Sequence, residues 1–248
     1  MHYTFRGKVD KIHGLTNDDF VPAQIDWLLN LAQLVEVKKR YLPFNNARKG
    51  FEGIQKRIDD LATIHVKSPQ KQVAIVPTLL VGTLLDSKIY ECKFSEFDFT
   101  YMFLTGLRAK ISTSDTCIKD IGLTQIQEDD LNDGLVNVNT KPDFNWGTAL
   151  FTIDASSQDA EAPGSIYIYS GDFNISEVYP SYLRYPRKLF FGGYVGFDYG
   201  IADPIVSCEL PTIIHDNIVD TACELAAAPL QDPEFLQLAK VNSEKFEY

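Results

Sequence analysis

The sequence has few of the residues from which catalytic and metal sites are built. Its four cysteines and four histidines are scattered over 248 residues, and no C-x-x-C pair occurs. Zinc sites need closely spaced thiolate and imidazole ligands, and small disulfide-bonded domains need a much higher density of cysteine. We therefore expect reduced thiols, no metal centre and no disulfide framework.

Motifs of nucleotide-binding and hydrolytic enzymes are also missing. The glycine-rich stretch 192–196 is not followed by the Gly-Lys-Ser/Thr of a phosphate-binding loop, and no G-x-S-x-G occurs. The acid pairs Asp59-Asp60 and Asp129-Asp130 are adjacent in sequence, so within a helix they do not face one another as an acid/base pair. The sequence thus shows no recognised catalytic constellation and no cofactor-binding motif, and we expect no cofactor.

No hydrophobic run approaches the roughly 20 residues of a membrane-spanning helix, so we expect no membrane partner. The charge, by contrast, is unevenly divided. Residues 1–68 hold 11 Lys and Arg against 8 Asp and Glu, a net charge of +3, whereas residues 69–248 hold 12 against 26, a net charge of −14. An acidic body does not bind nucleic acid by neutralising phosphates, but it suits a surface past which DNA slides without being held.

The clearest pattern that is present predicts one long helix. Pro22 suits a first helical turn and Pro43 ends the pattern, so we expect a helix over about 22–41. Its apolar residues form an arc roughly 200° wide, about twice what a one-sided surface helix needs. We therefore expect cover on two sides, from this chain or another subunit, with Trp27 and Leu31 in a helix-packed core. The narrow polar face holds Asp26, Asn30, Gln33, Glu36 and Arg40.

The remaining patterns separate helices from strands along the chain. Residues 1–15 read as an extended arm, and apolar residues at helical spacing predict a second helix over about 48–66, joined to the first by a turn at 43–49. Strand-type patterns follow, and helices return from Thr212. The expected strands lie in 73–112 and at 149–154, 165–169 and 177–185, and the expected C-terminal helices cover 212–229 and 233–240.

Because strands and helices do not alternate, we predict an α+β fold rather than a parallel sheet. It would consist of an N-terminal helical hairpin, a central antiparallel β-rich region and C-terminal helices. The corresponding division is a helical region at 1–68, a β-rich body at 69–211 and, at 212–248, C-terminal helices that pack back on the helical region.

The acidic stretch 127–134 (QEDDLNDG) shares some spacing with a calcium-binding loop. If Gly134 is its sixth position, Asp129 and Asp133 fit, but Leu131 stands where an oxygen ligand is required and Thr140 where a bidentate Glu belongs. A solvated acidic loop is the preferred interpretation, and the sequence leaves cation binding open.

Several short stretches at both ends of the chain together carry a family resemblance. They are IDWLLN at 25–30, AQ at 32–33, KKRY at 38–41, GFE at 50–52, KRIDDL at 56–61, YLRYPRK at 182–188, CELP at 208–211, HDNIVD at 215–220 and DPEFLQ at 232–237. In their order and spacing they resemble the ring-forming head–tail connector proteins of crAss-like tailed bacteriophages, short-tailed viruses of gut Bacteroidetes. The chain departs from the family pattern at 96–101, where a Pro-acid-Tyr segment is expected, and matches it loosely at 139–142.

The resemblance implies a structural protein of the virion, located at the head–tail junction or tail and in the host cytoplasm during assembly. Such a protein forms a homo-oligomeric ring of about twelve subunits, joins the portal protein to other neck and tail ring proteins, and gives genomic DNA a passage without specific binding. The residues that we expect at subunit contacts are Trp27, Leu31, Arg40, Tyr41, Arg184, Tyr185 and Arg187. The acids that we expect at the DNA passage are Glu128, Asp129, Asp130 and Asp133.

An alternative function follows from the abundant tyrosines and phenylalanines of the β-rich body. Aromatic rings can form stacking platforms for sugars, so a monomeric β-rich carbohydrate-binding or hydrolytic protein is the second hypothesis. The two hypotheses differ in solution mass, because only a connector must form large closed rings, alone or on its partner.

Overall fold

The computed structural model describes residues 1–13, 20–42, 55–67, 75–84, 87–96, 101–114, 117–154, 164–192 and 205–230. The chain divides into a helical unit, Met1–Ile64 with Pro186–Tyr248, and a β-rich unit, His65–Tyr185. The predicted α+β class is confirmed. The division differs from the predicted one, because the chain from Pro186 to the start of the C-terminal helix belongs to the helical unit.

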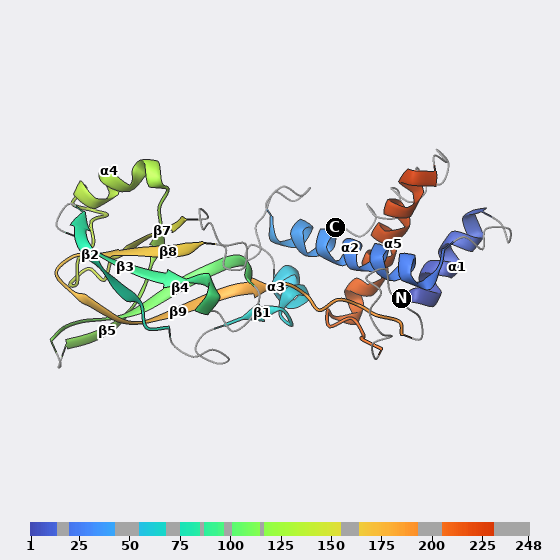
Figure 1. Ribbon diagram of the computed structural model, residues 1–248, viewed down its shortest axis with the longest axis horizontal. Coiled ribbons are helices and arrows are strands. Elements are labelled where there is room, and N and C mark those ends of the chain that lie inside the picture. The colour runs from blue at the N-terminus through green and yellow to red at the C-terminus, as the bar shows by residue number, and fades with distance from the viewer. Residues whose placement is uncertain are drawn as a thin grey trace. The chain divides into compact units, whose positions relative to one another are not determined.

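In the helical unit, helix α2 (Pro22–Tyr41) has the bounds that the sequence predicts (Figure 1). Pro22 occupies the first turn, where its missing N–H leaves no hydrogen bond unmade. The side chain of Gln24 accepts a hydrogen bond of 3.0 Å from the backbone N–H of Val21. Lys38, Lys39 and Arg40 lie in the last turn, where positive charge is favourable to the helix dipole.

Residues His2–His13 form helix α1, so the prediction of an extended arm is wrong. Phe5 and Val9, one helical turn apart, are both buried, and this spacing is the signal of a packed helix face. Lys8 donates to Asp220 of helix α5 (Thr212–Leu230) at 2.6 Å, which fixes α1 against that helix. Burial and the ion pair together explain why this segment is helical.

Helix α5 packs against both α1 and α2. Its buried face carries the apolar residues Ile214, Ile218, Val219 and Ala222. The expected second helix is shorter than predicted in its described part: α3 covers Gln55–Leu61, and His65–Val66 form strand β1 instead. The pairing of β1 with β9 satisfies backbone groups that a longer helix would have used. The expected turn at 43–49, the helix start near 48 and the helix at 233–240 lie outside the described residues.

The β-rich unit contains two sheets, one ordered β1-β9-β4-β5 and the other β2-β3-β8-β7-β6 (Figure 1). Neighbouring strands are antiparallel, except for the parallel pair β6 and β7. The strand bounds are β2 Thr78–Leu84, β3 Ser87–Lys93, β4 Tyr101–Ser114, β5 Cys117–Gly122, β6 Thr124–Gln125, β7 Leu150–Asp154, β8 Ser165–Ser170 and β9 Asn174–Arg184, and a 3-10 turn covers Phe94–Glu96.

One apolar core lies between the two sheets. Alternate residues of β4 (Leu107, Ala109 and Ile111) are buried in it, and Ile166 and Ile168 of β8 approach from the other sheet. This alternation is the reason that the strands could be predicted, since successive side chains point to opposite faces of a sheet.

The acidic stretch expected as a loop is helical. It forms the 3-10 turn Glu128–Asp130, followed by α4, Leu131–Val136. Leu131 and Leu135 of α4 pack on Leu150 and Tyr169 in a second, smaller apolar cluster over the five-stranded sheet. The apolar spacing of these two leucines therefore decides the local structure, and the acids remain on the outside.

Candidate functional site

The polar face of α2 is turned inward in the structure. The exposed fractions of Asp26, Gln33 and Glu36 are 6%, 1% and 5%. The predicted apolar arc is covered in part, since Ile25, Leu28 and Ala32 are buried as well, but the burial of the polar face was not expected. Burial of the polar groups is tolerated because each of them has a hydrogen-bond partner.

A segment of the same unit, residues 187–191, lies along this polar face. The side-chain amide of Asn30 donates to the carbonyl of Leu189 at 2.9 Å and accepts from its N–H at 2.6 Å. Gln33 donates to the carbonyl of Arg187 at 3.1 Å, and Asp26 accepts from the N–H of Phe191 at 2.8 Å. Alternate residues of the segment are thus bound as a neighbouring strand would bind them.

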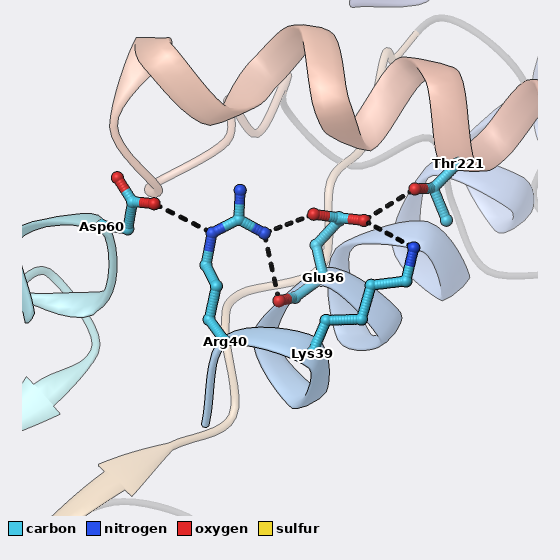
Figure 2. Close-up of polar contacts among 5 residues, drawn as sticks. All are labelled: Glu36, Lys39, Arg40, Asp60 and Thr221. Carbon is cyan, nitrogen blue, oxygen red and sulfur yellow. Dashed lines mark hydrogen bonds and ion pairs between the residues drawn. The ribbon is translucent and has the colours of Figure 1, made fainter. Parts of the chain in front are cut away.

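Beyond this segment, the polar face ends in a cluster of buried charges (Figure 2). Glu36 pairs with Arg40 in α2, and its other oxygen accepts from Thr221 of α5 at 2.7 Å and lies 3.4 Å from Lys39. The Nε of Arg40 donates to Asp60 of α3 at 3.0 Å. The cluster thus joins three helices through hydrogen bonds that have a fixed direction.

Electrostatics favour the ionised form of this cluster. Burial alone would raise the pKa of Glu36, but the charge and hydrogen bonds of Arg40, with further help from Thr221 and Lys39, lower it below the usual value. The side chain of Arg40 is only 12% exposed. The guanidinium of Arg40 is therefore bound by Glu36 and Asp60 inside the helical unit. Its contact with another subunit stays a prediction.

The opposite side of α2 carries an exposed apolar stripe, which we call the α2 stripe. Trp27 is 59% exposed, Leu31 and Leu34 are partly buried, and Lys38 and Leu42 continue the same row toward the end of the helix. The prediction that Trp27 lies in a helix-packed core is therefore wrong for the single chain. The physical reason is that α5 and residues 187–191 cover the other sides of the helix. The contact of Trp27, Leu31 and Tyr41 with another subunit stays a prediction.

Arg184, Tyr185 and Arg187 lie where the β-rich unit ends and the helical unit resumes. The side chain of Arg187 is 74% exposed and lies 3.9 Å from the carboxylate of Glu209, which also accepts from the backbone N–H of Arg187 at 2.7 Å. Tyr185 is 46% exposed. Both side chains are accessible, as a subunit contact requires, and such a contact remains to be tested.

The acids Glu128, Asp129, Asp130 and Asp133 are all exposed on the 3-10 turn and α4. Within the described residues, no group of three or more His, Cys, Asp or Glu side chains is arranged to hold a metal ion. The location of the four acids at a DNA passage stays a prediction.

The sequence reasoning missed Trp146, which is 84% exposed on a turn that follows α4. Asp143 and Thr148 close the turn with backbone hydrogen bonds of 3.0 and 3.1 Å, and the Asp143 carboxylate accepts from the N–H groups of Asn145 and Trp146 at 2.7 and 3.0 Å. Gly147 has φ of +66°, which favours glycine. The signal was available in the sequence as Asp-Phe-Asn-Trp-Gly, a turn-forming pattern that contains a large aromatic residue.

A small pocket of about 280 Å³ opens in the helical unit, and its lining includes His2, Asp26, Cys208 and His215. His2 is stacked on Phe191 with ring centroids 4.2 Å apart, and burial lowers its pKa. Burial raises the pKa of the Cys208 thiol, which therefore stays protonated at neutral pH. The pocket thus presents a neutral thiol and not the thiolate that a nucleophilic cysteine requires.

Comparison with protein-family models gave no match, and comparison with curated proteins gave none either. No helix within the described residues is long and apolar enough to cross a membrane.

Proposed function

We propose that this protein is a ring subunit of a phage head–tail connector, which joins the portal protein to the tail and gives the genome a passage. One observation carries the proposal. The 25–30 stretch, which belongs to the resemblance described above, begins the α2 stripe with its exposed Trp27. Exposed apolar patches on a folded unit mark places where another molecule binds.

The construction of α2 supports this role. Its polar side is held in place by hydrogen bonds to residues 187–191 and by the Glu36–Arg40–Asp60 cluster. The helix is thereby fixed in rotation, and Trp27 is held toward solvent before any partner arrives. A preorganised surface loses less conformational entropy on binding.

The charge distribution supports passage of DNA rather than binding. Residues 69–248 carry a net charge of −14, and a ring with such a charge around its bore would repel duplex phosphates. The proposal therefore requires little affinity for DNA. Salt-sensitive duplex binding by the purified protein at micromolar concentration or below would contradict this part of it.

The direct test is electron microscopy of the purified protein mixed with the cognate portal protein. We expect class averages in which a ring of this chain sits coaxially on the portal, with about twelve subunits. Images in which the portal stays bare at saturating concentrations of this chain would contradict the proposal. A portal protein from an unrelated phage is the control for non-specific adhesion.

A second candidate function is carbohydrate binding by the β-rich unit. It is favoured by Trp146, since an exposed ring on a rigid turn is also suited to stacking on a sugar. Glycan-array binding that is lost in Trp146→Ala, together with a monomeric mass, would support this candidate against the connector.

A further inference from the structure

The two tryptophans of the chain are both on the surface, one in each unit. Trp27 is 59% exposed in the helical unit, and Trp146 is 84% exposed in the β-rich unit. Tryptophan is usually among the more buried residues, and it is the residue most enriched among those that dominate binding energy at protein interfaces. Two exposed tryptophans therefore indicate two contact surfaces.

The segment that contains Trp146 is acidic in its overall composition. We call residues 127–148 the α4 segment; it holds five acids and one base, Lys141, a net charge of −4. Val136 and Val138 in this segment are 66% and 78% exposed, so that apolar side chains and carboxylates occur together. This composition suits a partner surface that is apolar and basic.

The α2 stripe has that composition. Its apolar residues Trp27, Leu31 and Leu34 are followed along the same row by the exposed Lys38. The acids of α2, Asp26 and Glu36, are buried on the other side of the helix and do not reduce the positive charge of the stripe. The α4 segment, with its net charge of −4, and the α2 stripe, with its lysine, are therefore opposite in charge, and each exposes apolar side chains.

The turn that bears Trp146 is rigid enough to serve as an anchor. Beyond its backbone hydrogen bonds, Phe144 packs on Phe173 with centroids 6.3 Å apart, and the ammonium of Lys119 lies 4.6 Å from the Phe144 ring centroid. Since the backbone around Trp146 is already ordered, little further entropy is lost when the ring is buried by a partner.

We propose that the α4 segment of one copy of this chain docks, through Trp146, on the α2 stripe of the next copy. The proposal rests on the ring function and names the contact that closes it. A ring needs a heterologous contact, made by two different surfaces that each subunit carries, and these two surfaces meet that requirement. It also assigns the exposed acids Glu128–Asp130 and Asp133 to the subunit contact rather than to the DNA passage.

The first test compares Trp27→Ala and Trp146→Ala by sedimentation velocity over a range of concentrations, with and without the cognate portal. Because both side chains are exposed, each variant should keep the wild-type melting temperature. Each should weaken subunit association about 30-fold or more. Ile213→Ala and Ile118→Ala are matched controls, since these residues are 69% and 54% exposed, and they should assemble normally.

The second test mixes the two variants in equal amounts. Each Trp27→Ala subunit keeps an intact Trp146 surface, and each Trp146→Ala subunit keeps an intact α2 stripe. The mixture should therefore form heterodimers that do not close, whereas each variant alone stays monomeric. This result distinguishes a heterologous contact from a symmetric one, in which one variant would dimerise by itself.

The outcomes separate this inference from the function on which it rests. If the wild type forms rings on the portal and both tryptophan variants do so equally well, the docking inference is overturned and the connector function stands. If the wild type stays monomeric in the presence of the portal, both the connector function and the docking inference are overturned. If the wild type is a monomer and Trp146→Ala has a lower melting temperature than the wild type, Trp146 makes a contact within one chain. This result would also overturn the inference.

Discussion

The two units of the chain are stabilised in different ways. The buried polar residues of the helical unit include four carboxylates, namely those of Asp26, Glu36, Asp60 and Asp220. Those of the β-rich unit are hydroxyl residues only, namely Ser87, Thr152 and Ser170, within the part of the chain that the structure describes. One unit therefore depends on directional polar contacts, and the other depends on apolar packing between two sheets.

The two units therefore also specify their internal arrangement in different ways. Apolar packing between sheets is set by the alternation along each strand, because a slip of one residue would turn the core side chains outward. A helix with apolar residues over a wide arc has no such constraint on its rotation. In α2 the constraint comes from Asn30, Gln33 and Glu36, whose hydrogen bonds can be made in one rotation of the helix only.

The largest expected effect is the loss of Arg40. Arg40→Ala leaves Glu36 and Asp60 buried without their guanidinium partner, and breaking such a buried pair costs about 3–5 kcal/mol. We expect urea unfolding, followed by circular dichroism, to show a loss of this size. The control is Lys38→Ala, which removes an exposed charge from the same helix turn and should change stability little. A loss below 1 kcal/mol for Arg40→Ala would show that the cluster contributes little.

The β-rich unit should be equally sensitive to apolar truncation and less sensitive to salt. Ile168 is fully buried between the sheets, so Ile168→Ala should cost about 2–5 kcal/mol and Ile168→Val about 0.5–1.5 kcal/mol. Measurements at low and high salt should give the same loss for Ile168→Ala. A strong salt dependence would contradict the view that this core is held by packing alone.

A smaller effect is expected where α2 binds residues 187–191. Asn30→Ala leaves the N–H and carbonyl of Leu189 without their side-chain partner, a loss of about 1–3 kcal/mol. Hydrogen exchange at the Leu189 amide should accelerate, while amides of β4 in the other unit keep their protection. Unchanged exchange at Leu189 would show that another group protects this amide.

The two units should also lose stability over different ranges of pH. Burial, and secondarily Lys67, lowers the pKa of His65 in the β-rich unit to about 4 from the usual 6.5. The unfolded chain therefore binds a proton between these values and the folded chain does not, so stability falls as pH drops from 6.5 toward 4. Glu36 in the helical unit affects stability only below pH 4.5, because its pKa is lowered in the folded chain. Its contribution to the free energy of unfolding is lost as the pH falls through that lowered pKa. The free energy of unfolding, measured from pH 7 to 4, should decrease with falling pH, and it should decrease less steeply in His65→Gln. An equally steep decrease in the variant would contradict the lowered pKa of His65.

The sequence predicted those parts of the fold that depend on local pattern. The bounds of α2 follow from Pro22 and Pro43, and the strands follow from alternation such as that of Leu107, Ala109 and Ile111. The burial of the polar face of α2 could not be predicted, because its hydrogen-bond partners are distant in sequence. Asn30 and Leu189, for example, lie about 160 residues apart. Helix α1 was missed because its packed face consists of a few residues, with Phe5 and Val9 at its centre.

The candidate site was predicted in part. The sequence predicted that the apolar residues of α2, including those of the α2 stripe, are covered by this chain or by another subunit. It did not predict that the stripe is exposed in a single chain, because this depends on which sides of α2 are occupied by α5 and residues 187–191. Trp146 was not recognised, although the turn that exposes it is closed by local hydrogen bonds of Asp143 and Thr148 and its pattern is visible in the sequence. The exposed side of α2, by contrast, depends on tertiary contacts, which local sequence patterns do not contain.

The most direct test of the central claim is the native mass of this chain in the presence of its cognate portal protein. The connector function predicts a discrete complex in which the portal carries about twelve copies of a 28.0 kDa chain, and no partly filled series at saturation. A spectrum that contains only the free portal and a 28.0 kDa monomer, at every concentration tested, would contradict it.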